Sequence, residues 1–183
     1  MIKIPQFSLF LDRDGVINEA VSEDYIKNWK EFKFKPDFIA HFPKICGLFA
    51  HIIVITNQQG VAKGLMSEAD LEDIHRNMQN EIINIGGRID KIYSATNLST
   101  TEPNFRKPNI WLALQAKLTF KQIDFNKSIM VGDNSSDMQF AKNTGMKSVL
   151  MKSLHNENKA IEADFVTSDW LHLSNHINKL FIL

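Results

Sequence analysis

The sequence predicts a three-layer α/β fold in which helices cover both faces of one doubly wound, mainly parallel sheet. Short apolar runs rich in β-branched residues alternate along the chain with longer segments whose apolar residues recur at helical spacing. Several of these runs end abruptly in polar residues, which indicates strands that present side chains at one edge of a sheet. With 183 residues and no linker or internal repeat, the chain is expected to form a single domain over 1–183.

The first part of the chain supplies two strands and a helix. A bulky apolar run at 7–11 predicts the first strand, and a polar stretch with scattered aromatic residues at 19–34 predicts an irregular excursion. A helix is expected over 36–49, with a kink or a broken first turn caused by Pro43. The β-branched run at 51–55 predicts the second strand.

The rest of the chain alternates in the same way. Ser67 is expected to cap a helix that runs to about 85, where Gly86 and Gly87 end it. The later strands are expected at 89–93, 127–131, 147–150 and 165–166. The later helices are expected around 110–118, after the polar segment 132–137 as far as about 143, and from 168.

Two carboxylates stand one residue apart where the first strand ends. Asp12 and Asp14 would lie on the same side of an extended backbone and repel each other unless a cation or a shared proton is present. A divalent metal ion resolves this repulsion, and Gly15 allows the chain to turn sharply away. Because Asp and Gly are also common turn residues, an ordinary polar turn is the alternative.

Three further polar residues stand beside the ends of other predicted strands. Thr56 closes the second strand, Lys107 opens the helix after the third, and Asp133 follows the fourth. Taken singly, they are typical of a turn residue, a surface lysine and a helix cap. Because the carboxyl ends of parallel strands meet at one edge, we expect all three to converge on the acidic pair.

These residue types suit phosphoryl transfer. An aspartate nucleophile forms an aspartyl-phosphate, and a second carboxylate protonates the leaving alkoxide and then deprotonates water. Mg²⁺ prefers oxygen ligands and offsets repulsion between carboxylate and phosphate. The Thr56 hydroxyl and the amides that follow it, beginning at Asn57, are suited to bind phosphoryl oxygens, while Lys107 balances charge. Asp137, one helical turn after Asp133, is suited to orient Lys107 or a metal-bound water.

Four motifs carry these residues, namely LFLDRDGVIN, VITN, the lysine of FRKPN, and VGDNSSD. In this order they resemble the motifs of the haloacid dehalogenase superfamily of phosphatases over nearly the whole chain. The resemblance implies the Rossmann-like core of that superfamily, with Asp12 as nucleophile and Asp14 as acid/base. It also implies Mg²⁺ held by the Asp12 carboxylate, the Asp14 main-chain carbonyl and Asp133. The intervals 14–56 and 56–107 are filled by predicted elements, so no large cap domain is expected.

Within that superfamily, DRDGVIN, TNQQGVAKG and FRKP resemble the D-glycero-D-manno-heptose 1,7-bisphosphate 7-phosphatases and the related histidinol-phosphatases. The resemblance implies a small phosphorylated metabolite as substrate, a sugar phosphate first and histidinol phosphate as an alternative, with Arg106 in its recognition. Those enzymes commonly carry a zinc-binding loop of Cys and His before the arginine. Residues 94–105 contain neither, so no zinc is expected.

Two other functions remain as alternatives. The uncapped site and the TNQ-G segment also resemble the 3′-phosphatase domain of polynucleotide kinases, which would make a nucleic-acid end the substrate. A non-enzymatic alternative is a phospho-accepting receiver-like signalling domain, in which acids, a Thr and a Lys surround an acceptor Asp. Receivers place the acceptor on a middle strand, whereas the second strand here ends in Thr56 and Asn57.

Composition limits the partners. Lys plus Arg and Asp plus Glu each number 21, so no net charge attracts the chain to nucleic acid or to a membrane surface. One cysteine, Cys46, excludes an internal disulfide and suits a reducing cytoplasm. Residues 1–5 lack the features of a signal peptide, and no apolar run is long enough to span a bilayer. We therefore expect a cytoplasmic monomer that acts on a small molecule.

Overall fold

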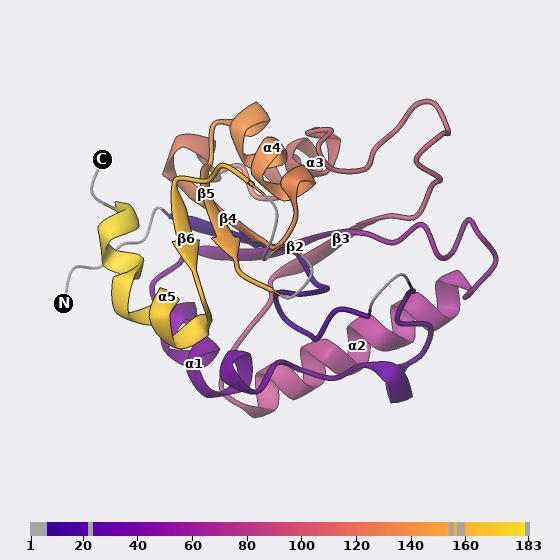
Figure 1. Ribbon diagram of the computed structural model, residues 1–183, viewed down its shortest axis with the longest axis horizontal. Helices are drawn as coiled ribbons and strands as arrows, with labels where there is room; N and C mark the ends of the chain where they lie inside the picture. The colour runs from indigo at the N-terminus through magenta and orange to yellow at the C-terminus, as the bar shows by residue number, and fades with distance from the viewer. Residues whose placement is uncertain (1–6, 22–23, 154–155, 157–159, 182–183) are drawn as a thin grey trace.

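The computed structural model describes residues 7–21, 24–153, 156 and 160–181, so the segment considered for a signal peptide lies outside them. Within this part of the chain, six parallel strands form one sheet in the order β3-β2-β1-β4-β5-β6 (Figure 1). The strands are β1 (Ser8–Leu11), β2 (His51–Asn57), β3 (Lys91–Ala95), β4 (Ser128–Gly132), β5 (Lys147–Met151) and β6 (Phe165–Thr167). The chain builds outward from β1 to β3 and then resumes on the other side of β1. The point where the strand order reverses therefore lies between β1 and β4, where open α/β sheets bind their ligands.

Helices cover both faces of the sheet (Figure 1). The α-helices of the described residues are α1 (Pro36–Cys46), α2 (Glu68–Asn84), α3 (Trp111–Thr119), α4 (Ser135–Thr144) and α5 (Trp170–His176). Three short 3₁₀ helices are η1 (Trp29–Glu31), η2 (Phe125–Lys127) and η3 (Ile177–Phe181). None of the helices in these ranges combines the length and the apolar character needed to cross a membrane.

Alternate residues of each strand enter two separate apolar cores, because successive side chains of a strand point to opposite faces. In β1, Leu9 and Leu11 pack in the core beneath α1, α2 and α5, whereas Phe10 packs in the core beneath α3 and α4. All three side chains are fully buried. The sheet is thus covered on both faces, as the apolar strands predict.

The C-terminal helix α5 fixes the loop that follows β1. Trp170 is fully buried, and its indole Nε1 donates to the main-chain oxygen of Val16 at 2.8 Å. Its main-chain nitrogen donates to Asp37 Oδ2, also at 2.8 Å. The C-terminal helix therefore holds both the turn of the first sequence motif and the start of α1.

Several element boundaries differ from the sequence prediction for identifiable reasons. Helix α1 passes through Pro43 but ends at Cys46 rather than near 49. Beyond this end, the Arg88 guanidinium donates hydrogen bonds to the carbonyls of Cys46, Phe49 and Ala50. This side chain replaces the helical bonds that would have continued α1. Strand β2 extends to Asn57 because its last residues still pair with β3, which begins at Lys91 instead of 89.

Candidate active site

The sequence-predicted site residues line one hollow at the carboxyl edge of the sheet. The hollow has a volume of about 350 Å³ and lies at the switch point between β1 and β4. Seven of its lining residues are those singled out from the sequence: Asp12, Asp14, Thr56, Asn57, Arg106, Lys107 and Asp133. The remaining lining residues are Ala20, Val21, Asn134 and Ser136. Parallel strand ends therefore bring together side chains that are far apart in the sequence.

Asp12 is the first residue beyond β1. Its main-chain nitrogen donates to the oxygen of Val131 in β4 at 2.9 Å, which carries the sheet pairing into the site. Its carboxylate accepts from the main-chain nitrogen of Arg13 at 2.7 Å and lies 2.9 Å from Lys107 Nζ. Burial, with the neighbouring carboxylates, raises the pKa of Asp12 to about 8, although Lys107 opposes this rise.

Lys107 carries its charge into the protein interior. Its side chain is only 1 % exposed and forms ion pairs with Asp12 Oδ1 at 2.9 Å and Asp137 Oδ1 at 2.6 Å. The ammonium also donates to the main-chain oxygen of Ile55 at 2.8 Å, so all three of its protons have partners. Burial alone would lower the pKa of Lys107, but the two carboxylates outweigh it and raise the pKa.

Asn57 acts on the main chain of Lys107. Its Oδ1 accepts from the Lys107 nitrogen at 2.9 Å, and its Nδ2 donates to the Lys107 oxygen at 3.2 Å. The sequence suggested substrate binding at this position, yet both ends of the amide side chain are used to hold the lysine. Asn57 still lines the hollow.

Three carboxylates gather beside the end of β1. Oxygens of Asp12, Asp133 and Asp137 all lie within 4.8 Å of one another. Two glycines make this close approach possible. A Cβ atom on Gly15, whose φ is +81°, would lie 2.1 Å from Asp133 Oδ2, and one on Gly132 would lie 2.2 Å from the Cβ of Asp137. Glycine is therefore required at both positions for the acids to reach this arrangement.

The Asp14 carboxylate is held by side chains that the sequence did not single out. It accepts from Arg13 Nε at 3.1 Å and Nη2 at 2.8 Å, from Asn18 Nδ2 at 2.9 Å and from Gln58 Nε2 at 2.8 Å. Burial would raise the pKa of Asp14, but the Arg13 charge and these bonds lower it. Arg13, Asn18 and Gln58 are themselves fully buried. In the sequence, these three residues could be noticed only because they are polar and lie within or directly after the first two motifs.

His75 of α2 supports this arrangement from outside the motifs. Burial and the adjacent Arg13 charge lower the pKa of His75 to about 3, so its ring is neutral at physiological pH. Its Nε2 lies 3.3 Å from Arg13 Nη1 and accepts a hydrogen bond, since a guanidinium only donates.

Thr56 and Arg106 complete the walls of the hollow. The buried Thr56 hydroxyl accepts from Gln58 Nε2 at 2.9 Å and keeps its own proton to donate. Arg106 is half-buried, and its Nη1 is enclosed without a hydrogen-bond partner among the described residues. Burial lowers the pKa of this guanidinium, while Tyr25 opposes the shift. A buried donor without a partner favours an anionic or hydroxyl-bearing ligand here.

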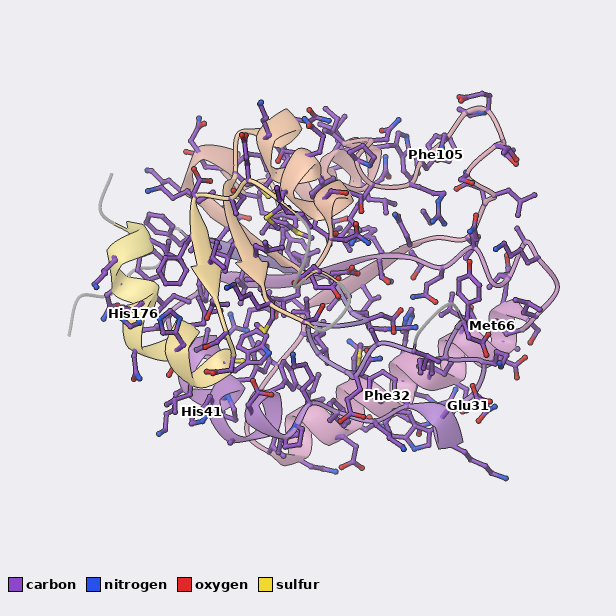
Figure 2. All side chains as sticks on the ribbon, in the orientation of Figure 1. Glu31, Phe32, His41, Met66, Phe105 and His176 are labelled. Carbon is purple, nitrogen blue, oxygen red and sulfur yellow. The ribbon has the colours of Figure 1, made fainter. Side chains whose placement is uncertain are left out.

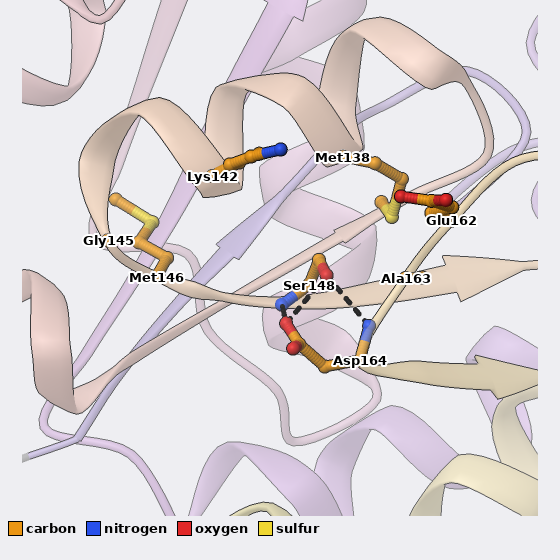
Figure 3. A pocket seen from close by; sticks show the side chains of 8 residues that line it. All are labelled: Met138, Lys142, Gly145, Met146, Ser148, Glu162, Ala163 and Asp164. Atoms are coloured by element: carbon orange, nitrogen blue, oxygen red, sulfur yellow. Dashed lines mark hydrogen bonds between the residues drawn. The ribbon is translucent and has the colours of Figure 1, made fainter.

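A second hollow lies between α4 and the segment that enters β6 (Figure 3). Its main polar feature is a reciprocal pair. The Ser148 nitrogen and hydroxyl both donate to Asp164 Oδ2 at 2.7 Å, and the Asp164 nitrogen donates back to the hydroxyl at 2.9 Å. These bonds join β5 to the residue before β6, so the pair has a structural role in holding the two strands together.

Comparison with known proteins gives one consistent result. A family model described as HAD-hydrolase-like matches residues 104–172. The D-glycero-alpha-D-manno-heptose-1,7-bisphosphate 7-phosphatase of Mycobacterium bovis is 38% identical over 138 residues, which cover 75% of this chain and 73% of the relative. The enzyme of the same name from Campylobacter jejuni is 35% identical over 162 residues, covering 86% and 87%.

The fold has a close counterpart among solved structures. The D,D-heptose 1,7-bisphosphate phosphatase from B. bronchiseptica, complexed with magnesium and phosphate, superposes with a TM-score of 0.83. Its sequence is 24% identical, and the match covers 94% of this chain and 98% of that one. The predicted three-layer fold without a large cap domain is therefore confirmed.

Proposed function

Because this chain belongs to the haloacid dehalogenase-like hydrolases and is a phosphatase, we propose that the hollow at the β1/β4 switch point hydrolyses a sugar phosphate through a phosphoryl group carried on Asp12. One observation carries the proposal. Asp12 lies against a buried lysine and within 4.8 Å of two further carboxylates, at the end of the central strand. This arrangement suits a nucleophilic carboxylate, because Lys107 balances its charge and the strand end fixes its orientation.

The acidic cluster fits a magnesium ion. Its donors are carboxylate oxygens, which Mg²⁺ prefers, and Gly15 leaves the space that Asp133 needs beside them. We assign the Asp12 and Asp133 carboxylates and the Asp14 main-chain carbonyl as ligands, with Asp137 paired to Lys107. The Asp14 side chain is engaged elsewhere, which leaves its carbonyl for this role. Bound there, the ion would offset repulsion between Asp12 and the phosphoryl oxygens.

The proposed reaction has two steps. In the first, an Asp12 oxygen forms a bond to phosphorus, the bond from phosphorus to the ester oxygen breaks, and Asp14 protonates that oxygen. In the second, Asp14 removes a proton from water, which attacks phosphorus and releases phosphate and Asp12. The Thr56 hydroxyl and the main-chain amide of Asn57 bind the phosphoryl oxygens throughout, while the Lys107 ammonium balances the charge on Asp12 and the phosphoryl group.

The substrate is proposed to be D-glycero-D-manno-heptose 1,7-bisphosphate, the sugar named in the relatives. A bisphosphate supplies a second anion, and the enclosed Nη1 of Arg106 at the wall of the hollow lacks a partner that such an anion would provide. All seven proposed site residues come from one chain, and we propose that it acts as a monomer.

The substrate proposal predicts a clear ranking. With Mg²⁺ present, kcat/KM for either anomer of the heptose bisphosphate should exceed that for histidinol phosphate or a 3′-phosphorylated oligonucleotide by at least about tenfold. Phosphate release measures this, and EDTA should abolish it until Mg²⁺ is restored. A preference for the oligonucleotide would contradict the proposal. So would a single phosphorylation without turnover, which is the behaviour of a receiver domain.

Gly15→Ala tests the fit of the acidic cluster. The new methyl group would meet Asp133 in a backbone conformation that favours glycine, so we expect a loss of about 2 kcal/mol in the free energy of unfolding and a large loss of phosphatase activity. Gly64→Ala is the matched control, because Gly64 also has a positive φ of +70° but nothing lies within 4 Å of its Cβ position. Urea denaturation and phosphate release measure both effects. Equal activity in the two variants would refute the role of the contact with Asp133.

A further inference from the structure

Three loops lie beside the proposed active site; the first and the third contribute Ala20, Val21, Arg106 and Lys107 to its lining, and the second contacts both of them. They follow β1, β2 and β3 and comprise residues 19–28, 58–66 and 96–109, with 22–23 outside the described residues. Figure 2 shows Met66 of the second loop and Phe105 of the third at the end of the molecule opposite His176. Recognition of the substrate beyond its phosphoryl group depends on how these loops are held relative to one another.

The side chain of Gln59 joins all three loops. Its Nε2 donates to the Tyr25 hydroxyl of the first loop at 2.9 Å, and its Oε1 accepts from the main-chain nitrogen of Ser99 in the third at 3.1 Å. The Tyr25 hydroxyl also accepts from Lys63 Nζ at 3.1 Å. A Cβ atom on Gly60 would lie 3.1 Å from Tyr25 Cγ, so the ring packs against the backbone next to Gln59. Both ends of one amide are therefore committed to residues of other loops.

The contact at Ser99 continues to Arg106. Ser99 oxygen accepts from Asn104 Nδ2 at 3.0 Å, and Asn104 Oδ1 accepts from the main-chain nitrogen of Arg106 at 3.0 Å. Asn109 Nδ2 donates to the Asn104 oxygen at 2.7 Å and closes the loop. Gln59 thus acts on the backbone at Arg106 through two consecutive hydrogen-bonded residues.

The Tyr25 hydroxyl, at one end of this series of contacts, is affected by the charge of Arg106 at the other end. Burial would raise the pKa of the Tyr25 hydroxyl, but its hydrogen bonds from Gln59 and Lys63 and the nearby charges of Lys63 and Arg106 lower it. The Arg106 charge therefore acts on the Tyr25 hydroxyl across the loops. A shift of the third loop moves Arg106, whose Nη1 is enclosed without a hydrogen-bond partner in the described residues.

We propose that Gln59 is a positioning residue for substrate specificity, which ties the three loops together and sets Arg106 against the part of the substrate beyond the reacting phosphoryl group. This inference rests on the proposed function. Asp12 and Thr56 lie at strand ends, and Lys107, although it follows Arg106 in the third loop, is held by its own contacts to Asp12, Asp137 and the Ile55 oxygen. Loss of the Gln59 bonds therefore affects recognition of a phosphorylated sugar while the transfer of a phosphoryl group from a minimal ester continues.

Two variants and a matched control test the proposal. Gln59→Leu removes both bonds at similar volume, and Tyr25→Phe removes only the hydroxyl. Gln139→Leu is the control, because Gln139 is an exposed glutamine whose side chain donates to Asn143 of the same helix and to no other loop. The substrates are p-nitrophenyl phosphate and the phosphorylated sugar with the highest kcat/KM for the wild type. Amide hydrogen exchange at Ser99 and Arg106 supplies a readout besides activity.

In Gln59→Leu, we expect KM for the phosphorylated sugar to rise roughly tenfold with kcat little changed, because about two net hydrogen bonds are lost from the walls. We expect kcat/KM for p-nitrophenyl phosphate to stay within about twofold of wild type. Exchange at Ser99 and Arg106 should quicken. Tyr25→Phe should change KM in the same direction, and the double variant should be no worse than Gln59→Leu, since both act through one set of contacts.

A parallel loss on both substrates would assign Gln59 to general stability and overturn the proposal. Unchanged KM for the sugar, or unchanged exchange at Ser99, would overturn it as well. Failure of the proposed function would be seen separately, because the wild type would then hydrolyse neither substrate. In that case the exchange measurement alone decides whether Gln59 ties the loops.

Discussion

Asp12→Asn is expected to abolish phosphate release, with kcat lower by roughly 10⁴-fold or more, because the amide cannot form the bond to phosphorus. The fold should persist. An asparagine oxygen still accepts from the Arg13 nitrogen and from Lys107, whose second ion pair with Asp137 remains. Steady-state kinetics with the preferred sugar phosphate measure the loss, and thermal unfolding should show a midpoint close to that of the wild type.

Asp73→Asn is the matched control for this substitution, because Asp73 is a partly exposed aspartate of α2 that pairs with side chains of its own helix. Its activity should equal that of the wild type. Retained activity in Asp12→Asn would exclude Asp12 as the nucleophile. Loss of activity together with unfolding would instead show that Asp12 has mainly a structural role.

Lys107→Met is expected to have the largest effect on stability. The substitution leaves the fully buried Asp137 and the nearby Asp12 without their cation, and an uncompensated buried charge costs about 3–5 kcal/mol of the free energy of unfolding. Activity should fall as well, because the ammonium no longer balances charge on the phosphoryl group. Urea denaturation at neutral pH measures the first effect.

A second substitution separates charge from packing in this prediction. Adding Asp137→Asn to Lys107→Met removes one unpaired carboxylate and should restore about 1–2 kcal/mol of the free energy of unfolding. Lys121→Met is the control, since Lys121 is exposed on the surface and should change stability little. If Lys107→Met were as stable as the control, the buried ion pairs would not hold this part of the site together.

The sequence predicted the position of the site better than its internal bonds. Asp12, Thr56 and Asp133 are next to strands whose apolar pattern is easily recognised, and a parallel sheet brings all such ends to one edge. That placement depends on topology alone. It holds even though β3 begins at Lys91 instead of 89 and α1 ends at Cys46.

The bonds within the site depend on partners that are distant in the sequence, which a residue type does not specify. Asn57 and Lys107 are 50 residues apart, and nothing in either side chain indicates that the amide holds the lysine backbone. Gln58 likewise meets Asp14 across 44 residues. The end of α1 depends on the remote Arg88 in the same way. Such contacts follow from packing of the whole chain.

The most direct test of the account is the identification of a phosphorylated aspartate during turnover. Asp14→Asn should retain attack on p-nitrophenyl phosphate, whose leaving group needs no proton, but should hydrolyse the intermediate slowly. After acid quenching, peptide mass spectrometry is predicted to find one hydroxylamine-labile phosphoryl group on Asp12, absent when Asp12→Asn is added. A phosphoryl group on another residue, or a full equivalent of p-nitrophenol released without any labelled peptide, would contradict the account.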